Sequence, residues 1–435
     1  MSDVAVIGAG YVGLTTAACL THLGHSVRCA DIDVERVVAL NEGKVPIRED
    51  GLEELVRDGL ASGKLSFVVG ASNAAAKSEF VFLCVPTPQG DDGSADLSYV
   101  ESVVGEIAPV LRPRTIVLNK STMPVGSTRL VQRVLESAGA GLHELSVASN
   151  PEFLREGTAV HDFLHPDRVV IGCEDPDTAV RVSDLYRGID APIMVTDPAS
   201  AEMIKYASNA FLATKISFVN AIANLCEAVG ADVREVTIGM GYDRRIGAEF
   251  LRPGPGYGGS CFPKDTAALL YAAEQAGYDF GLLRGVVEVN RNQHERMVEK
   301  VRAILGGSLS GTEVAVLGLT FKANTDDMRE SPAVAIAQQL AAEGALIRAY
   351  DPSVDAGVSR DGDDVLAGFE LATDPYEACK GADALVILTE WDELRRLDFD
   401  RVRELMRRPL IVDTRNMLDP AALRHSGFTY KGVGR

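Results

Sequence analysis

A cysteine at position 261 lies between paired glycines and a lysine–aspartate pair, in the stretch Gly258-Gly259-Ser260-Cys261-Phe262-Pro263-Lys264-Asp265. The residues that follow, Thr266 to Ala276, predict a helix. A cysteine at a helix start meets the positive end of the helix dipole, and a nearby lysine adds to that field, so the reactive thiolate is favoured. Glycines let a ligand approach the backbone closely. We interpret Cys261 as a candidate nucleophile; the alternative is a small buried hydrophobic residue.

The start of the chain follows a strand–turn–helix pattern around three spaced glycines. Val4–Ile7 is a short apolar strand, and Gly8-Ala9-Gly10-Tyr11-Val12-Gly13 follows it at the start of a predicted helix. In a dinucleotide-binding fold Gly8 makes the tight turn, Gly10 admits the pyrophosphate, and Gly13 lets helix and strand pack closely. The helix N-terminus then meets the phosphate charge. The motif in this context predicts a dinucleotide site.

The acid that ends the next strand bears on the choice of cofactor. The strand Ser26–Ala30 is followed directly by Asp31. Its carboxylate is expected to accept hydrogen bonds from the adenosine ribose and to repel a 2′-phosphate, which favours NAD over NADP. Arg36 is close enough to keep NADP open. The alternative for Asp31 is a turn residue at the strand end.

Two threonines follow further predicted strands. The strand Phe80 to Val85 leads into Pro86-Thr87-Pro88, and the strand Thr115 to Leu118 leads into the loop 120–126, which contains Thr122. Ligands of open parallel sheets bind at the carboxyl ends of the strands. We therefore expect Thr87 and Thr122 to touch cofactor or substrate, although both could be turn formers beside prolines.

The opening pattern returns in the last third of the chain. Glu313–Gly318 resembles Asp3–Gly8, and Ala345–Asp351 resembles Ser26–Asp31. Between the two patterns, Ala201 to Val229 predicts an unusually long helix. The fold class predicted is α/β, with two Rossmann-like doubly wound domains joined by a long central helix in a helical dimerisation region. The second glycine loop is reduced, so no dinucleotide is expected there, although its lysine and Arg329 could hold phosphate.

Composition restricts the partners. The 435 residues carry a formal net charge of −19, and such a surface repels nucleic acid. None of the seven cysteines forms a C-x-x-C pair, which is typical of a reduced, intracellular protein without a zinc site. No uninterrupted apolar run reaches the roughly 18 residues of a membrane span. We expect a soluble, cytoplasmic protein with no metal, nucleic-acid or membrane partner.

Six ordered motifs carry a resemblance over nearly the whole chain. The chain resembles the UDP-glucose/GDP-mannose dehydrogenase family. The motifs are Gly8-x-Gly10-Tyr11-Val12-Gly13, Val85-Pro86-Thr87-Pro88, Lys120-Ser121-Thr122-Met123-Pro124-Val125-Gly126, Asn150-Pro151-Glu152-Phe153-Leu154-Arg155-Glu156-Gly157, Lys205-Tyr206-Ala207-Ser208-Asn209-Ala210-Phe211 and the cysteine loop from Gly258 to Asp265. Phe262 favours the branch that acts on UDP-glucose.

The resemblance implies a four-electron oxidation. The C6 alcohol of the hexose in a nucleotide sugar becomes a carboxylate, and two NAD are reduced; UDP-glucose would give UDP-glucuronate. GDP-mannose or TDP-glucose remains an alternative substrate for the same mechanism. A two-electron NAD dehydrogenase with a structural Cys261 and a non-catalytic nucleotide sensor are further alternatives. One NADH per substrate would mark the first, and NAD binding without turnover the second.

The resemblance also implies the catalytic roles. Lys205 and Asn209 lie four residues apart, hence on one face of the predicted helix, and would stabilise the developing alkoxide. Cys261 would form a thiohemiacetal and then a thioester. Glu156 would activate the water for hydrolysis, with Thr122 and Asp265 as hydrogen-bond partners. Without the family, these side chains could equally be surface, capping or salt-bridge residues.

The binding residues implied by the resemblance fall into two sets. Those for NAD are Gly8, Gly10, Tyr11, Val12, Gly13, Asp31, Arg36, Thr87, Thr122, Glu156, Lys264 and Arg329. Those for the nucleotide sugar are Glu152, Phe153, Leu154, Lys205, Asn209, Arg245, Phe250, Leu251, Arg252, Gly258, Phe321, Lys322 and Arg415. Arg245 matches a position that reaches the neighbouring subunit's sugar, which implies a homodimer. The expected regions are an NAD-binding domain at 1–199, a central dimerisation region with the cysteine loop at 200–300 and a nucleotide-sugar-binding domain at 301–435.

Overall fold

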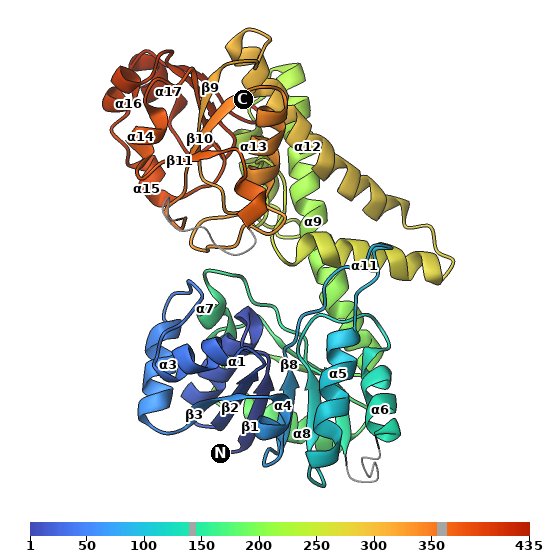
Figure 1. Ribbon diagram of the computed structural model, residues 1–435. Helices are drawn as coiled ribbons and strands as arrows, with labels where there is room; N and C mark the ends of the chain where they lie inside the picture. The colour runs from blue at the N-terminus through green and yellow to red at the C-terminus, as the bar shows by residue number, and fades with distance from the viewer. Residues whose placement is uncertain (139–144, 355–362) are drawn as a thin grey trace. The chain divides into compact units, whose positions relative to one another are not determined.

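The computed structural model describes residues 1–138, 145–354 and 363–435 (Figure 1). The chain divides into two compact units. The first contains Met1–Ser208 and Ala267–Tyr278, and the second contains Asn209–Thr266 and Asp279–Arg435. The division into functional regions at 1–199, 200–300 and 301–435 stays a prediction.

Within its described residues, the first unit is built on one eight-stranded sheet. Its order is β3-β2-β1-β4-β5-β6-β7-β8, and all neighbours pair in parallel except β6 and β7. The strands are β1 (Asp3–Ile7), β2 (Ser26–Asp31), β3 (Leu65–Val69), β4 (Phe80–Leu83), β5 (Ile116–Asn119), β6 (Ser146–Ser149), β7 (Val169–Gly172) and β8 (Ile193–Thr196). The strand order reverses beside β1, where doubly wound sheets bind their ligands.

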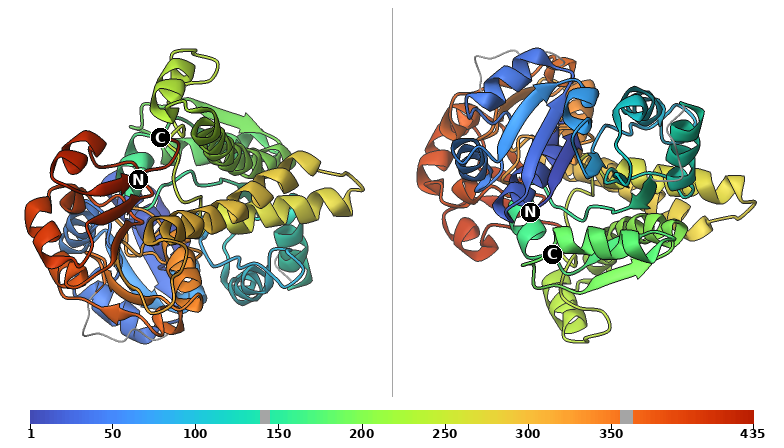
Figure 2. Two further views of the ribbon diagram at one scale, coloured as in Figure 1. Left: turned by 90° about the horizontal axis from the view of Figure 1, so that it is seen from above. Right: turned by 90° about the horizontal axis from the view of Figure 1, so that it is seen from below.

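Helices cover both faces of this sheet, because its central strands are apolar on both sides (Figure 2). Val4 and Val6 of β1 belong to one core cluster, and the alternating Ala5 and Ile7 belong to the other. The helices are α1 (Tyr11–His22), α2 (Val34–Asn41), α3 (Leu52–Ala61), α4 (Ala71–Ala75), α5 (Ser98–Ile107), η1 (Ala108–Val110), α6 (Ser127–Ser137), α7 (Ala159–Leu164) and α8 (Pro176–Leu185).

The second unit repeats the same strand order. Its described residues form a parallel six-stranded sheet, β11-β10-β9-β12-β13-β14, so the predicted fold class is confirmed. The strands are β9 (Glu313–Leu317), β10 (Leu346–Tyr350), β11 (Glu370–Leu371), β12 (Ala384–Ile387), β13 (Leu410–Asp413) and β14 (Thr429–Lys431). The helices assigned after β9 are α13 (Pro332–Ala342), η3 (Asp363–Leu366), α14 (Pro375–Cys379), α15 (Asp392–Arg395), α16 (Phe399–Leu405) and α17 (Pro420–His425).

Four further helices lie between the two sheets in the sequence. They are α9 (Pro198–Val229), α10 (Val233–Gly241), α11 (Phe262–Gln275) and α12 (Gly281–Leu305). The boundary between the units falls within α9, after Ser208, and within α11, after Thr266. The predicted long helix is therefore present and begins three residues before its expected start.

By length and composition α9 is the one helix among the described residues that could cross a membrane. Its buried polar side chains are nevertheless hydrogen-bonded to the protein. Glu202 accepts hydrogen bonds from the backbone N–H groups of Gly126 and Thr128, and Asn220 accepts one from Gly254. These buried polar side chains join α9 to two loops of the protein.

Candidate active site

The glycine loop has the geometry that a dinucleotide requires. A Cβ on Gly8, whose φ is +102°, would lie 2.6 Å from the Cys84 carbonyl oxygen, and a Cβ on Gly13 would lie 1.8 Å from the Gly8 oxygen. A Cβ on Gly10 would meet nothing within 4 Å, so this backbone is open to a ligand. Tyr11 begins α1, whose N-terminal N–H groups can hold phosphate. The loop therefore fits a bound dinucleotide.

Asp31 lies beside this loop, and its carboxylate already accepts hydrogen bonds from the protein backbone. Its Oδ2 accepts a hydrogen bond of 2.8 Å from the Ala9 N–H, and its Oδ1 accepts one of 3.0 Å from the Asp33 N–H. The Arg36 guanidinium lies 3.5 Å from the same carboxylate. Arg36 is therefore directed at Asp31, a pairing that the sequence did not predict.

Replacing Asp31 with serine is expected to weaken NAD binding about tenfold or more, because a hydrogen bond to a charged group contributes about 1.5–3 kcal/mol. The discrimination against NADP should fall as well, because the repelling carboxylate is gone and Arg36 is freed. Calorimetric titration with both cofactors measures this, with exposed Glu35→Gln as the matched control. Unchanged NAD affinity would remove Asp31 from the site.

The two predicted threonines meet at the carboxyl ends of β4 and β5. The Thr87 hydroxyl donates a hydrogen bond of 2.9 Å to the Thr122 carbonyl oxygen, and both residues are buried. They therefore hold two neighbouring loops together, which is also what turn-forming residues would do.

A buried ion pair joins α9 to the loop after β6. Lys205 Nζ lies 2.9 Å from Glu152 Oε1, and each side chain is only 4% exposed. Burial alone would raise the pKa of Glu152, but the Lys205 ammonium and the Leu154 N–H, which donates a hydrogen bond of 2.6 Å, hold that pKa below its usual value. The Phe153 ring lies 5.4 Å from the Lys205 ammonium. The predicted residues Glu152, Phe153, Leu154 and Lys205 are thus brought together.

The water-activating candidate, Glu156, follows in the same loop and is half-buried. The arginine before it forms an ion pair of 2.6 Å with Asp162 on α7. Gly157 comes next with a φ of +82°, a conformation that glycine adopts without cost. Glu156 therefore lies between an arginine that is paired with α7 and a glycine at which the backbone turns.

The cysteine loop ends where α11 begins. Cys261 directly precedes the first helical residue, Phe262, so the helix starts four residues earlier than the predicted Thr266. All seven cysteines lie in the described part of the chain and none forms a disulfide; Cys261 is half-buried, whereas the other six are buried. Burial raises the pKa of Cys19, Cys84 and Cys379 to about 12, which leaves those thiols unreactive.

A second cluster of predicted residues surrounds the buried carboxylate of Asp265. Its Oδ2 accepts a hydrogen bond of 2.6 Å from Asn209 Nδ2, and its Oδ1 accepts one of 2.6 Å from Lys264 Nζ. The Asp265 N–H donates to the Cys261 carbonyl oxygen at 3.0 Å. The Asp265 carboxylate thus holds Asn209 and Lys264, and the Asp265 backbone N–H contacts the cysteine loop.

The paired glycines of this loop are explained by packing within the protein. A Cβ on Gly258 would lie 2.0 Å from the Glu330 carbonyl oxygen, and one on Gly259 would lie 2.8 Å from the Phe321 ring. These glycines were expected to let a ligand approach the backbone. The close approach is instead made by the segment after β9, which carries predicted substrate residues.

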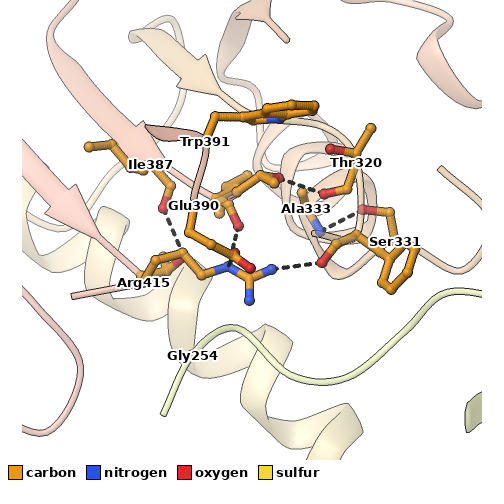
Figure 3. Close-up of polar contacts among 12 residues, drawn as sticks. Gly254, Thr320, Ser331, Ala333, Ile387, Glu390, Trp391 and Arg415 are labelled. Carbon is orange, nitrogen blue, oxygen red and sulfur yellow. Dashed lines mark hydrogen bonds and ion pairs between the residues drawn. The ribbon is translucent and has the colours of Figure 1, made fainter. Parts of the chain in front are cut away.

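Arg415, after β13, is held between that segment and the loop after β12. It donates hydrogen bonds of 2.7 Å to the Leu388 carbonyl oxygen and 2.9 Å to the Phe321 carbonyl oxygen. Figure 3 shows its guanidinium between Glu390, whose carboxylate is 3.0 Å away, and the chain that follows Thr320. A Cβ on Gly254 would lie 3.6 Å from Arg415 Nη1. These contacts fix the direction of the guanidinium.

The remaining predicted substrate residues differ in exposure. Leu251 is buried, and the Phe250 ring packs edge-on against Phe262 at 6.4 Å between centroids. Lys322 Nζ lies 5.4 Å from the Phe321 ring. Arg245, Arg252 and Arg329 are exposed. Arg245 and Arg329 form local ion pairs with Asp243 and Asp327, at 2.6 and 2.7 Å.

The second unit gives a physical reason why its own glycine loop does not suit a dinucleotide. Asp351 occupies the position that Asp31 has in the first unit, but it is buried. Its Oδ2 accepts hydrogen bonds from the Leu319 N–H at 2.7 Å, the Thr320 N–H at 3.1 Å and the Trp391 indole at 3.1 Å. A ribose would have to displace these contacts. Among the described residues, no group of three or more His, Cys, Asp or Glu side chains could hold a metal ion.

Family models match three successive regions of the chain. Residues 2–190 match the NAD binding domain of the UDP-glucose/GDP-mannose dehydrogenase family, residues 199–292 match its central domain, and residues 315–420 match its UDP binding domain. The chain belongs to this family. The resemblance stated from the motifs and the cofactor prediction, NAD, are confirmed.

Other members of the family match over the full length. A UDP-glucose 6-dehydrogenase of Rhizobium meliloti (strain 1021) is 47% identical over 99% of each chain, and one of Bacillus subtilis (strain 168) is 47% identical over 100% of this chain and 98% of its own. The solved structure of a UDP-glucose dehydrogenase from Pyrobaculum islandicum is 38% identical, with a TM-score of 0.91 over 100% of this chain and 98% of that one.

Two buried charged residues of this family member were missed by the sequence argument. Lys120 donates hydrogen bonds to Asn150 Oδ1 at 3.2 Å and to the Tyr186 hydroxyl at 3.4 Å, and burial lowers its pKa to about 8. It thereby ties the Thr122 loop to the loop of Glu152. Glu202, on α9, holds the N-terminus of α6 through Gly126 and Thr128. Lys120 lies inside a quoted motif and Glu202 lies one turn before Lys205, so only their position beside motif residues could have signalled them.

Proposed function

We propose that the protein oxidises C6 of UDP-glucose to the carboxylate of UDP-glucuronate. The observation that carries the proposal is the thiol of Cys261, half-buried directly before α11 and next to the cluster of Asn209, Lys264 and Asp265. Two-electron alcohol oxidation needs no such nucleophile. The names of the full-length relatives support UDP-glucose as the substrate.

In the first half of the proposed reaction, the C6 alcohol becomes an aldehyde. Two NAD molecules, held in turn at the glycine loop, would supply the oxidising chemistry, one for each hydride. Lys205 and Asn209 donate hydrogen bonds to the substrate oxygen as its proton passes to a water molecule, because a developing alkoxide needs fixed donors. Lys205 suits this role because its burial with Glu152 fixes the ammonium and excludes bulk water.

In the second half, the Cys261 thiolate adds to the aldehyde carbon and forms a thiohemiacetal. Loss of the second hydride leaves a thioester at Cys261. Glu156 takes a proton from water, the water oxygen bonds to the carbonyl carbon, and the C–S bond breaks, which returns the thiolate and releases the acid. Thr122 and Asp265 would orient the groups of this step.

The test is the amount of NADH formed per mole of limiting UDP-glucose, followed by absorbance. A ratio of about two is expected for alcohol to acid, since each hydride reduces one NAD. A ratio of about one would mean that the aldehyde is released. If no NADH forms, UDP-glucose is not the substrate, and TDP-glucose and GDP-mannose are tested next.

The proposal divides the chain into an NAD-binding domain at 1–199, a central region at 200–300 and a nucleotide-sugar-binding domain at 301–435. In the last, Phe321, Lys322 and Arg415 would hold the nucleotide. The protein is further proposed to act in the cytoplasm, supported by seven cysteines without a disulfide in the described chain.

The proposed assembly is a homodimer formed through α9. An apolar stripe of exposed residues runs along this helix: Met203, Phe211, Phe218, Leu225 and Val229. The three central positions are seven residues apart, so they lie on one face of the helix, as in helices that pack in pairs. A second copy of α9 would cover this stripe and would supply Arg245, which is 89% exposed, to its partner's site.

Changing Phe211, which is 65% exposed, to aspartate is expected to separate the dimer, because a charge on the stripe would be buried without a partner. The mass by light scattering should fall from twice the chain mass of 46.4 kDa to that mass, and activity should be lost with it. Val180→Asp, which changes an exposed residue of α8, is the matched control. A monomeric wild-type protein with full activity would overturn the dimer.

A further inference from the structure

Three groups far apart in the sequence converge beside the glycine loop. The Gly157 N–H donates to the Tyr11 hydroxyl oxygen at 2.6 Å and to Glu49 Oε2 at 2.7 Å. The Tyr11 hydroxyl itself donates to Glu49 Oε2. Glu49 lies in the loop before α3 and is buried. We call Tyr11, Glu49 and Gly157 the carboxylate bridge.

The bridge connects two functional segments of the first unit. Tyr11 is the first residue of α1, directly after the glycine loop that fits the dinucleotide phosphates. Gly157 directly follows Glu156, and its backbone N–H is the group that Tyr11 and Glu49 hold. A shift of the glycine loop is therefore passed to Glu156 through one carboxylate and one phenol.

Tyr11 is among the residues expected to bind NAD, but the bridge has no part in the bond-making steps assigned so far. Neither the Tyr11 hydroxyl nor Glu49 donates to an alkoxide or attacks a carbonyl in the proposed steps. A purely structural tie between α1 and the Glu156 loop would stabilise the fold and would affect all steps alike. A functional tie would affect the step that needs Glu156 and leave the hydride transfers nearly unchanged.

Resting on the proposed function, we propose that Glu49 is a positioning residue, which holds the Glu156 loop against the cofactor loop so that Glu156 is aligned for thioester hydrolysis. The alignment of Glu156 matters late in the catalytic cycle, because water must attack the thioester only after the second oxidation. The Glu49 carboxylate accepts one hydrogen bond from the Gly157 N–H and one from the Tyr11 hydroxyl. Two such contacts can hold the loop to within about 0.5 Å. Misplacement by about 1 Å can cost on the order of a hundredfold in rate.

The test is a pre-steady-state burst experiment with the full-length enzyme and an excess of both UDP-glucose and NAD. In Glu49→Gln, NADH should appear in a burst of about two per subunit while release of the acid slows about tenfold or more. Intact-protein mass spectrometry of quenched samples should then show the covalent acyl adduct on the chain. Tyr11→Phe, which leaves the direct contact between Glu49 and Gly157, should lie between wild type and Glu49→Gln.

Exposed Glu54→Gln on α3 is the matched control, expected to match wild type. Equal slowing of NADH formation and acid release in Glu49→Gln, or acid release at the wild-type rate, would overturn the inference alone. If Glu49→Gln does not fold, Tyr11→Phe decides by the same two rates. A wild-type protein that forms no acid from UDP-glucose would overturn the proposed function and this inference together.

Discussion

Replacing Cys261 with serine is expected to abolish formation of the acid, with a loss on the order of a thousandfold or more, as for removal of other catalytic nucleophiles. A serine hydroxyl can add to the aldehyde, but it is rarely ionised, and the ester that it would form is a poorer acyl donor than a thioester. The first oxidation does not need the thiol and should continue. NADH and UDP-glucuronate are measured separately on the same samples.

The control for this variant is Cys173→Ser. Cys173 is a buried thiol of the first unit whose Sγ contacts the Asp175 carbonyl oxygen at 3.6 Å, a contact that serine can keep. It should retain nearly full activity. Full acid formation by Cys261→Ser would remove the covalent mechanism, and the thiol would then be structural, as the alternative from the sequence held.

Replacing Lys205 with methionine is expected to reduce both activity and stability. The change leaves the Glu152 carboxylate buried without its cation, which costs about 3–5 kcal/mol of folding free energy. Loss of a fixed donor to the developing alkoxide should lower kcat by about 10²–10³. Urea unfolding and steady-state kinetics measure the two effects on the same preparation.

The double variant Lys205→Met, Glu152→Gln separates the two roles of the lysine. The neutral glutamine removes the unpaired buried charge and keeps an acceptor for the Leu154 N–H, so much of the lost stability should return. Activity should stay low because the donor is still missing. Recovery of activity in the double variant would show that Lys205 acts through the fold and not on the substrate.

The glycine loop could be predicted because its causes are local. Gly13 is constrained by the Gly8 carbonyl oxygen of the same turn, and apolar periodicity predicts the strand before the loop and the helix after it. Asp31 follows from the same unit. The second sheet was predicted for the same reason, since its strands repeat the first pattern and its order is the same.

The contacts between distant segments could not be predicted in this way. Lys205 and Glu152 are separated by 53 residues, and Asn209 and Asp265 by 56, so no spacing rule links them. Their inclusion in the candidate site came from the family motifs. Glu49 shows the limit of that route: it lies outside every motif, and only the folded loop brings it to Gly157.

The division of the chain within α9 and α11 has a consequence for how such a protein can be taken apart. The chain passes between the two compact units three times, after Ser208, Thr266 and Tyr278, so neither unit is one uninterrupted stretch of sequence. No single cut in the gene yields two self-sufficient halves. Recombination could replace the N-terminal or the C-terminal segment of such a protein only if residues 198–278 stay intact. The middle of the gene is therefore the segment that must be inherited whole.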